Sequence, residues 1–158
     1  MKGFLFIILL TSFACTGKVC ITEDDITPDI FYAEGSFSPF TGKCNVIGSN
    51  SKVLLEQFSY KNGLLHGKAL AWYKNGQLKR KGSYSNGKLS GPWEFWDEKG
   101  NKTLEANYEN DELNGSFISL ESDGRIKEKG VYTANRRTGK WTCNIEEVVI
   151  QKGELKQP

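Results

Sequence analysis

Hydrophobic and polar side chains alternate with a period of two in several short segments of this chain. In the clearest segment, alternate positions from Leu78 to Tyr84 fall on one side of an extended backbone. The intervening positions are polar, and they are Gln77, Lys79, Lys81 and Ser83. Alternation of this kind is typical of a β-strand that packs on one face and meets water on the other. The pattern therefore predicts strands whose two faces differ.

The same pattern recurs at a fixed interval of 24 residues. Because the whole chain contains only six tyrosines, four of them in register are not a chance arrangement. Self-similarity at this period is the signature of a repeat protein in which each unit contacts only its neighbours. The interval separates four tyrosines (Tyr60, Tyr84, Tyr108, Tyr132) and two ladders of glycines (Gly67, Gly91, Gly115, Gly139 and Gly76, Gly100, Gly124).

Two kinds of turn separate the strands of each unit. The first contains a dipeptide that ends in glycine: Asn75-Gly76, Lys99-Gly100 or Asp123-Gly124. Such dipeptides supply the positive φ that two-residue hairpin turns require. The second turn follows each tyrosine and is rich in residues that tolerate the left-handed region. Its members are Asn62-Gly63, Asn86-Gly87, Asn110-Asp111 and Ala134-Asn135. We therefore expect an all-β fold of successive antiparallel β-hairpins.

The position two residues before a repeated tyrosine is small in three units, where it is Gly82, Ala106 or Gly130. Glycine weakens the interior of a strand, so its recurrence suggests the close approach of another group. We expect a neighbouring aromatic ring, such as that of Trp93 or Phe117, to lie across this position.

Composition places the chain among ordinary globular proteins. Of its 158 residues, 38% are apolar and 25% are charged, and 17 glycines with 19 aromatic residues favour a turn-rich β protein. The formal net charge is +2, and it is +1 without Lys2. This balance leaves no basic footprint for nucleic acid, so we expect no nucleic-acid partner.

Residues 1–14 differ from the rest of the chain and are interpreted as a signal peptide. An apolar run from Phe4 to Leu10 follows Lys2, and it is much shorter than the roughly 20 residues that span a bilayer. Cys15, directly after Ala14, resembles a bacterial lipobox, although Ser12 stands where that signal usually has Leu. The resemblance implies lipidation of Cys15 and a membrane-anchored lipoprotein, in the outer membrane or facing the periplasm. The alternative is ordinary secretion, and both interpretations export the chain.

Residues 15–41 lack clear periodicity and are expected to form a tether, with the repeat domain at residues 42–158. Export permits disulfides. In a stacked array Cys44 lies near the first strand and Cys143 near the ninth, roughly 40 Å away, too far for a bridge. With Cys15 lipidated, Cys20–Cys44 is the one bridge that we propose, and two buried, unpaired thiols are the alternative.

The segment from Tyr84 to Trp96 reads Tyr-Ser-Asn-Gly-Lys-Leu-Ser-Gly-Pro-Trp-Glu-Phe-Trp. It resembles the MORN-repeat family, specifically its bacterial variant form, and the resemblance covers about Gly42 to Trp141. It implies an elongated, twisted antiparallel sheet of successive hairpins. The variant form is often labelled as an antitoxin of toxin–antitoxin pairs, and the wider family is associated with membrane contact and protein scaffolding.

Catalytic chemistry finds little support in the sequence. His66 is the only histidine, so no two-histidine metal site can form, and His66 occupies a position that is a polar turn residue in the other units. Cys143 matches core positions of other units and is expected to be a small core residue. The run Glu23-Asp24-Asp25 cannot aim three carboxylates at one point. We therefore expect no enzyme, no cofactor and no metal site.

The candidates for recognition are Trp72, Trp96 and Leu120, which occupy equivalent positions in successive units. Either they form an exposed stripe that marks a partner surface, or the sheet curls enough to bury both of its faces; we favour the stripe. The predicted function is a non-enzymatic exported repeat protein that binds or scaffolds another protein at the cell envelope. The alternative is an antitoxin or immunity protein that neutralises a partner toxin.

Overall fold

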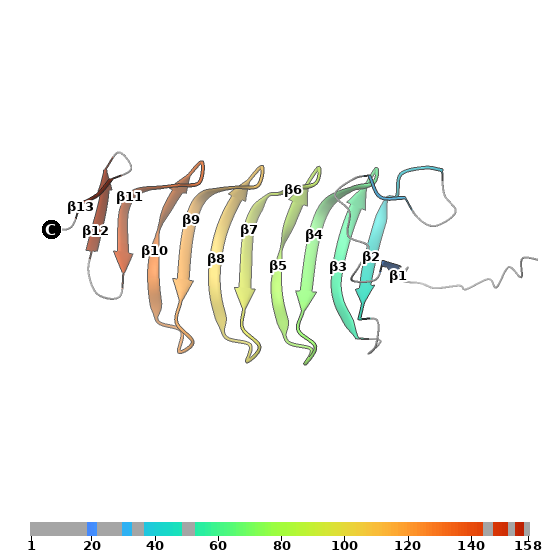
Figure 1. The fold of residues 1–158 in the computed structure, drawn as a ribbon, viewed down its shortest axis with the longest axis horizontal. Helices are drawn as coiled ribbons and strands as arrows, with labels where there is room; N and C mark the ends of the chain where they lie inside the picture. Colours follow the sequence, from blue (N-terminus) through green and yellow to red (C-terminus); the bar gives the residue numbers. More distant parts are fainter. Residues whose placement is uncertain are drawn as a thin grey trace, which may run out of the picture.

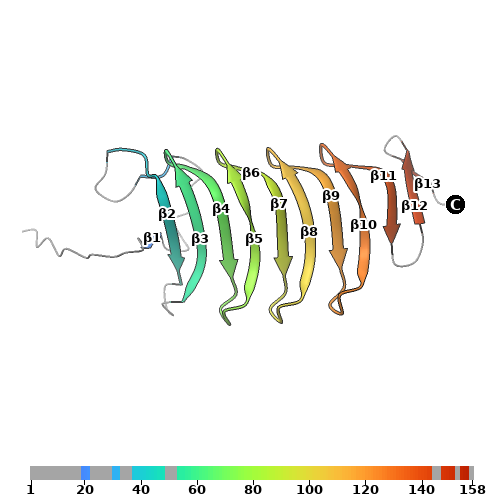
Figure 2. The ribbon, with the colours of Figure 1, turned by 180° about the vertical axis from the view of Figure 1, so that it is seen from behind.

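The described part of the chain forms one open β-sheet without any helix (Figure 1). Strands follow one another across the sheet in the order of the sequence, so the molecule is a ribbon of hairpins, as Figure 2 shows from behind. The predicted all-β array of hairpins is confirmed. This computed structural model describes residues 19–21, 30–32, 37–48, 53–143, 147–151 and 154–156.

Neighbouring strands are antiparallel, except that β1 pairs with β2 in parallel. β6 and β7 both pair with β5 and act as one bent strand. The strands are β1 (Val19–Ile21), β2 (Gly42–Ile47), β3 (Leu54–Lys61), β4 (Leu64–Trp72), β5 (Leu78–Ser85), β6 (Lys88–Leu89), β7 (Gly91–Trp96), β8 (Lys102–Glu109), β9 (Glu112–Leu120), β10 (Ile126–Thr133), β11 (Arg136–Cys143), β12 (Glu147–Gln151) and β13 (Glu154–Lys156).

The glycine ladder that begins at Gly67 marks a recurring β-bulge. The pairing register between β3 and β4 shifts between Phe58 and Tyr60, opposite Gly67, and an equivalent shift lies opposite Gly115 in β9. Gly67 has a φ of 94° and Gly115 a φ of 112°, values that side chains with a Cβ rarely adopt. A bulge bends a strand and increases its twist, which explains why this glycine recurs in every unit.

The turns that follow the tyrosines join each hairpin to the one before it. The backbone N–H of Gly87 donates to the carbonyl of Leu65 at 2.8 Å, and that of Asp111 donates to the carbonyl of Leu89 at 3.2 Å. Asp111 Oδ1 also accepts from the N–H of Leu89 at 2.7 Å. Asn86 and Asp111 adopt positive φ, as predicted for these two-residue turns. The substitution of Asp for Gly thus keeps the turn and adds a bond between units.

The turns at Asn75-Gly76 and its equivalents were predicted to be two-residue turns, and this prediction is wrong. The N–H of Gly76 donates to Tyr73 O and the N–H of Tyr73 to Gln77 O, so the loop is longer and only Gly76 has positive φ. The reason lies in the side chain of Asn75, whose Oδ1 accepts from the N–H of Gln77 at 3.0 Å. That bond fixes the loop without a left-handed asparagine.

The small positions accommodate tryptophan rings, as expected. A Cβ added at Gly82 would lie 2.1 Å from the Trp93 ring, and one at Gly130 would lie 2.3 Å from the Trp141 ring. Trp93 is 2% exposed and its Nε1–H donates to Ser83 O at 3.1 Å. For both glycines, the ring belongs to the strand that follows the strand of the glycine. The ring over Gly130 is therefore that of Trp141, and not that of Phe117 in the preceding strand.

Part of the predicted tether belongs to the folded array. Phe31 and Phe40 pack against Tyr60, with ring centroids 5.1 and 6.0 Å from that of the tyrosine. Gly63 donates its N–H to Phe40 O at 2.7 Å and accepts from the N–H of Phe31 at 2.9 Å. These contacts resemble those that a preceding hairpin makes in later units. The first hairpin has no such neighbour, so residues without repeat periodicity cap it.

Two faces of the sheet as candidate binding surfaces

Strand pairing assigns each side chain to one of two faces. We call the face that carries Tyr84, Trp93 and Phe117 the aromatic face, and the opposite one the outer face. Residues that pair directly share a face, so one row per face can be followed from β2 to β11. The outer row is Asn45, Gln57, Leu70, Lys81, Glu94, Glu105, Ile118, Lys129 and Thr142, and the aromatic row is Val46, Glu56, Ala71, Arg80, Phe95, Leu104, Ser119, Glu128 and Cys143.

The structure brings the three predicted binding residues together on the outer face. Trp72, Trp96 and Leu120 each lie two positions after a member of the outer row, in β4, β7 and β9. All three side chains are half-buried rather than fully exposed. They repeat every second strand, at a spacing of about 10 Å. The geometry thus forms a stripe across the ribbon, and the role of this stripe in binding stays a prediction.

An ion network surrounds Trp96. The ammonium groups of Lys81 and Lys102 lie 5.5 and 5.6 Å from the centre of its ring, within the range of cation–π attraction. Glu94 joins the two lysines, with Oε1 at 2.8 Å from Lys81 Nζ and Oε2 at 2.6 Å from Lys102 Nζ. Hydrogen bonds from Lys102 and Lys81 lower the pKa of Glu94. Bonds to Glu105 and Glu94 raise the pKa of Lys102. The ring is therefore framed by fixed charges of both signs.

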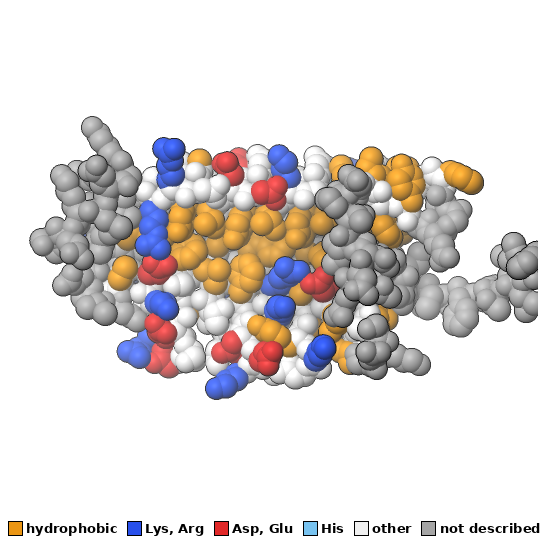
Figure 3. Space-filling model, viewed as in Figure 1, with side chains coloured by type: hydrophobic (Ala, Val, Ile, Leu, Met, Phe, Trp, Pro, Cys, Tyr) orange, Lys and Arg blue, Asp and Glu red, His pale blue; other side chains and the backbone are white. Residues whose placement is uncertain are grey.

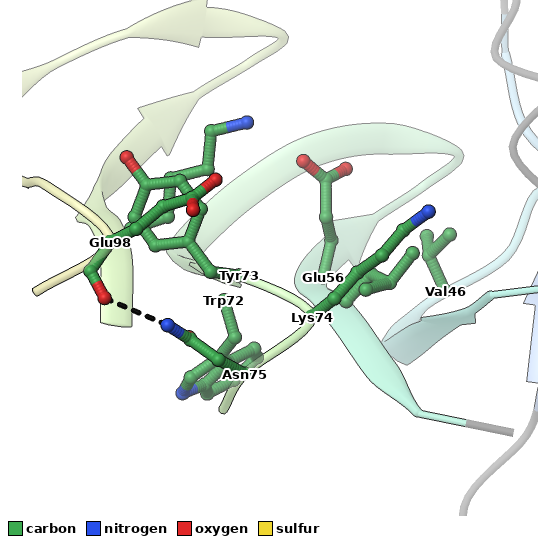
Figure 4. A pocket seen from close by; sticks show the side chains of 9 residues that line it. Val46, Glu56, Trp72, Tyr73, Lys74, Asn75 and Glu98 are labelled. Carbon is green, nitrogen blue, oxygen red and sulfur yellow. Dashed lines mark hydrogen bonds between the residues drawn. The ribbon is translucent and has the colours of Figure 1, made fainter. Parts of the chain in front are cut away.

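Trp72 borders a hollow of about 600 Å³ at the end of the first hairpins. Figure 4 shows the Trp72 ring pointing away from the ring of Tyr73, with Glu56 and Lys74 across the hollow. Asn75 Nδ2 donates to Glu98 O at 2.7 Å, which holds one wall in place. This hollow could not be predicted from the sequence, because it forms between loops of different units. It combines aromatic rings with ammonium and carboxylate groups, which suits a polar partner segment.

The aromatic face carries a continuous apolar band that crosses the strands (Figure 3). Its rings contact one another edge-on: the Tyr84 centroid lies 5.2 Å from that of Trp93, and the Phe117 centroid lies 5.2 Å from that of Tyr132. Burial raises the pKa of Tyr84, and it does the same for Tyr108.

Among the described residues, every strand belongs to this one sheet, so no second layer covers the band. Sequence reasoning assigned this face to the core and missed that it stays partly open. The length of the unit could have indicated this, because 24 residues that form two strands leave no further helix or strand to cover the face.

The two residues that were considered for catalysis both lie in strands. His66 lies within β4 rather than in a turn, and its Nδ1 accepts from the N–H of Asn86 at 3.4 Å. Cys143 is half-buried at the end of β11. No cluster of three or more potential metal ligands occurs within the described ranges. The same residues include no helix long and apolar enough to cross a membrane.

The predicted lipidation site, Cys15, lies outside the described residues, as does the acidic run before residue 30. Cys20 belongs to β1, whose backbone runs beside β2 and therefore beside Cys44. The Cys20 side chain is not among those described, so the Cys20–Cys44 bridge stays a prediction. Cys44 lies in β2 and Cys143 in β11, eight strands further along the sheet, so the two are far apart as expected.

The recurrence of one hairpin, joined only to its neighbours, defines this chain as a β-hairpin repeat protein. Residues 65–86 and 89–110 match the family model described as MORN repeat variant. Each matched segment begins at a leucine, Leu65 or Leu89, whose carbonyl accepts a backbone hydrogen bond from the turn after the next tyrosine. Each segment ends within that same turn. No curated protein matches the chain. The family indicates a repeat protein involved in binding.

Proposed function

We propose that this chain is a non-enzymatic, exported protein-binding module that acts at the cell envelope, where lipid on Cys15 anchors it to a membrane. The observation that supports binding most directly is the outer-face stripe of Trp72, Trp96 and Leu120. One member comes from each successive hairpin, and each is half-buried. Tryptophan is enriched among residues that dominate the energy of interfaces. A stripe of this kind offers several anchors in a line to one partner.

The charges of the outer face favour a protein as the binding partner, rather than a surface that carries charge of one sign. Along the outer row the sign changes from Lys81 to Glu94 and Glu105 and back to Lys129. An anionic lipid headgroup layer or nucleic acid would attract the lysines and repel the glutamates. A protein surface can match both signs, and such matching gives specificity and register.

Site-directed photo-crosslinking in envelope preparations tests this proposal. A benzophenone amino acid placed at Trp96 or Leu120 should form a discrete adduct with one partner. The same probe at Ser85, an exposed position near the far end of β5, is the matched control and should form none. Equal adducts at all three positions would show that the stripe does not select a partner. Unfolding curves of the three proteins verify that each is folded.

Mass spectrometry of the mature N-terminus tests the anchor separately. We expect the chain to begin at Cys15 with a lipid on its sulfur, and the protein to fractionate with membranes. The matched variant Cys15→Ser should be released. An unmodified Cys15 would contradict the tether but leave secretion, and the binding proposal, in place.

A further inference from the structure

Two ion pairs lie beside the apolar band on the aromatic face. Before its centre, Arg80 Nη2 of β5 lies 2.6 Å from Glu56 Oε1 of β3. After its centre, Arg137 Nη2 of β11 lies 2.8 Å from Glu128 Oε2 of β10. Side-chain exposures are nearly equal in the two pairs, at 35% and 20% for Arg80 and Glu56 and 37% and 22% for Arg137 and Glu128. Figure 3 shows acidic and basic side chains beside the band.

Both pairs have the same polarity along the ribbon. In chain order the signs are negative at Glu56, positive at Arg80, negative at Glu128 and positive at Arg137. Arg80 and Glu128 belong to the same row and lie two strands before and two strands after β8. Reversing the order of this pattern inverts every sign. A copy of the face laid over it in the opposite direction, centred on β8, therefore places Arg80 of one copy against Glu128 of the other.

We propose that two copies of this chain associate through their aromatic faces, about a two-fold axis that runs parallel to the strands over β8. The axis brings Arg80 of one copy to Glu128 of the other, while the apolar bands of the two copies meet beside this contact. A sheet with one apolar face is stabilised by a second layer. This chain supplies one layer among its described residues, and the second copy supplies the other. Such an interface is isologous, the commonest kind in homodimers.

The size of the band makes the association weak. From β3 to β11 the face spans seven strand spacings, about 34 Å, and the rows from Arg80 to Tyr84 add about 14 Å along the strands. Each copy therefore offers on the order of 450 Å², or about 900 Å² in total, below the usual range for stable complexes. We expect a concentration-dependent equilibrium. The dimer leaves both outer faces free, so it extends the proposed function, which uses the opposite face.

Sedimentation equilibrium of two charge-reversed variants tests the dimer. The variants E56R/R80E and E128R/R137E each reverse one ion pair and keep that pair inside its own chain. In either variant alone, the two-fold axis places like charges together at positions 80 and 128. In a 1:1 mixture these two positions again carry opposite charges in the two copies. We expect wild type to dimerise, each variant alone to dimerise at least tenfold more weakly, and the mixture to regain the wild-type constant.

Several results would overturn the proposal. If wild type stays monomeric up to millimolar concentration, a second copy does not cover the band, and the occupant is something else, such as a segment of a different protein. Variants that dimerise alone as well as wild type would show that the charge pattern does not set the contact. A mixture no tighter than its components would exclude the antiparallel arrangement. Equal urea midpoints for the three proteins establish that folding is unchanged, and crosslinking from Trp96 separates failure here from failure of the proposed function.

Discussion

The two faces of this sheet are built from alternate residues of the same strands, yet they are held in different ways. On the aromatic face, large rings lie over glycines, as Trp93 does over Gly82. On the outer face, Trp96 is flanked by lysines that share Glu94. Packing against small residues tolerates little change, whereas exposed ion pairs contribute little and adapt. The comparison indicates that packing on the aromatic face maintains the ribbon, whereas the outer face tolerates change, as the binding role proposed for it requires.

The largest expected contrast is between two tryptophans three residues apart. Trp93→Ala removes a ring that is 2% exposed and should lower the free energy of unfolding by about 3–5 kcal/mol. Trp96→Ala removes a half-buried ring on the outer face and should cost about 1 kcal/mol. Urea unfolding followed by circular dichroism measures both. Equal losses would erase the distinction between the faces.

A methyl group at Gly82 should be nearly as harmful as losing a ring. The added Cβ of Gly82→Ala would meet the Trp93 ring at 2.1 Å, so ring and strand must both shift, at a cost of about 1–3 kcal/mol. The matched outer-face change is Ser83→Gly, which we expect to cost about 0.5–1 kcal/mol through backbone entropy. Thermal unfolding compares the two. A Gly82→Ala variant as stable as wild type would show that the tryptophan does not need the glycine.

Alkaline pH should weaken the aromatic face. Burial raises the pKa of Tyr84 above its usual value of 10.0, so the unfolded chain loses the phenolic proton first. The stability that the buried Tyr84 hydroxyl contributes is therefore fully present below about pH 10, and it is lost as pH rises through the folded-state pKa. Tyr84→Phe should reduce the loss between pH 8 and pH 11, as chemical unfolding at each pH measures. If the free energy of unfolding of Tyr84→Phe falls with pH as steeply as that of wild type, the Tyr84 hydroxyl is exposed to water in the folded protein.

Acid should act on the outer face, with the smallest effect. Lysine hydrogen bonds lower the folded-state pKa of Glu94 below its usual value of 4.5. The stability it contributes is present above that value and is lost as pH falls through the folded-state pKa. Because the network is at the surface, the loss should be below about 1 kcal/mol. In Glu94→Gln the midpoint of unfolding should depend less on pH between pH 6 and pH 3. A pH dependence equal to that of wild type would contradict a role for this carboxylate.

The repeat could be predicted from sequence because its signals are local. Asn86-Gly87 requires a left-handed turn, and the alternation from Arg80 to Tyr84 fixes which residues share a face. Leu78 is the exception, because a register shift pairs it with Trp72 of the outer face. The small residue at Gly82 even indicated a ring above it. The loop at Asn75 could not be predicted, since a side-chain bond to the N–H of Gln77 replaces the positive φ.

Contacts between units were harder to foresee. Phe31 and Phe40 lie outside the periodic pattern, and only the missing neighbour of Tyr60 explains why they pack there. The alternating polarity of Arg80 and Glu128 is likewise invisible until the register places both residues in one row. The stripe of Trp72 and Trp96 was predicted as a pattern, but the lysines that lie over the Trp96 ring come from neighbouring strands and could not be placed from the sequence.

Small-angle X-ray scattering across a concentration series tests most directly whether this ribbon is a single layer with one face left open for a second copy. As wild type is concentrated, the scattering mass should double while the longest dimension changes little, and the cross-section should thicken by about 10 Å, one sheet spacing. E56R/R80E should keep the mass of one chain throughout. Doubling of the longest dimension would show end-to-end association instead, and a constant wild-type mass would contradict closure of the aromatic face by a second copy.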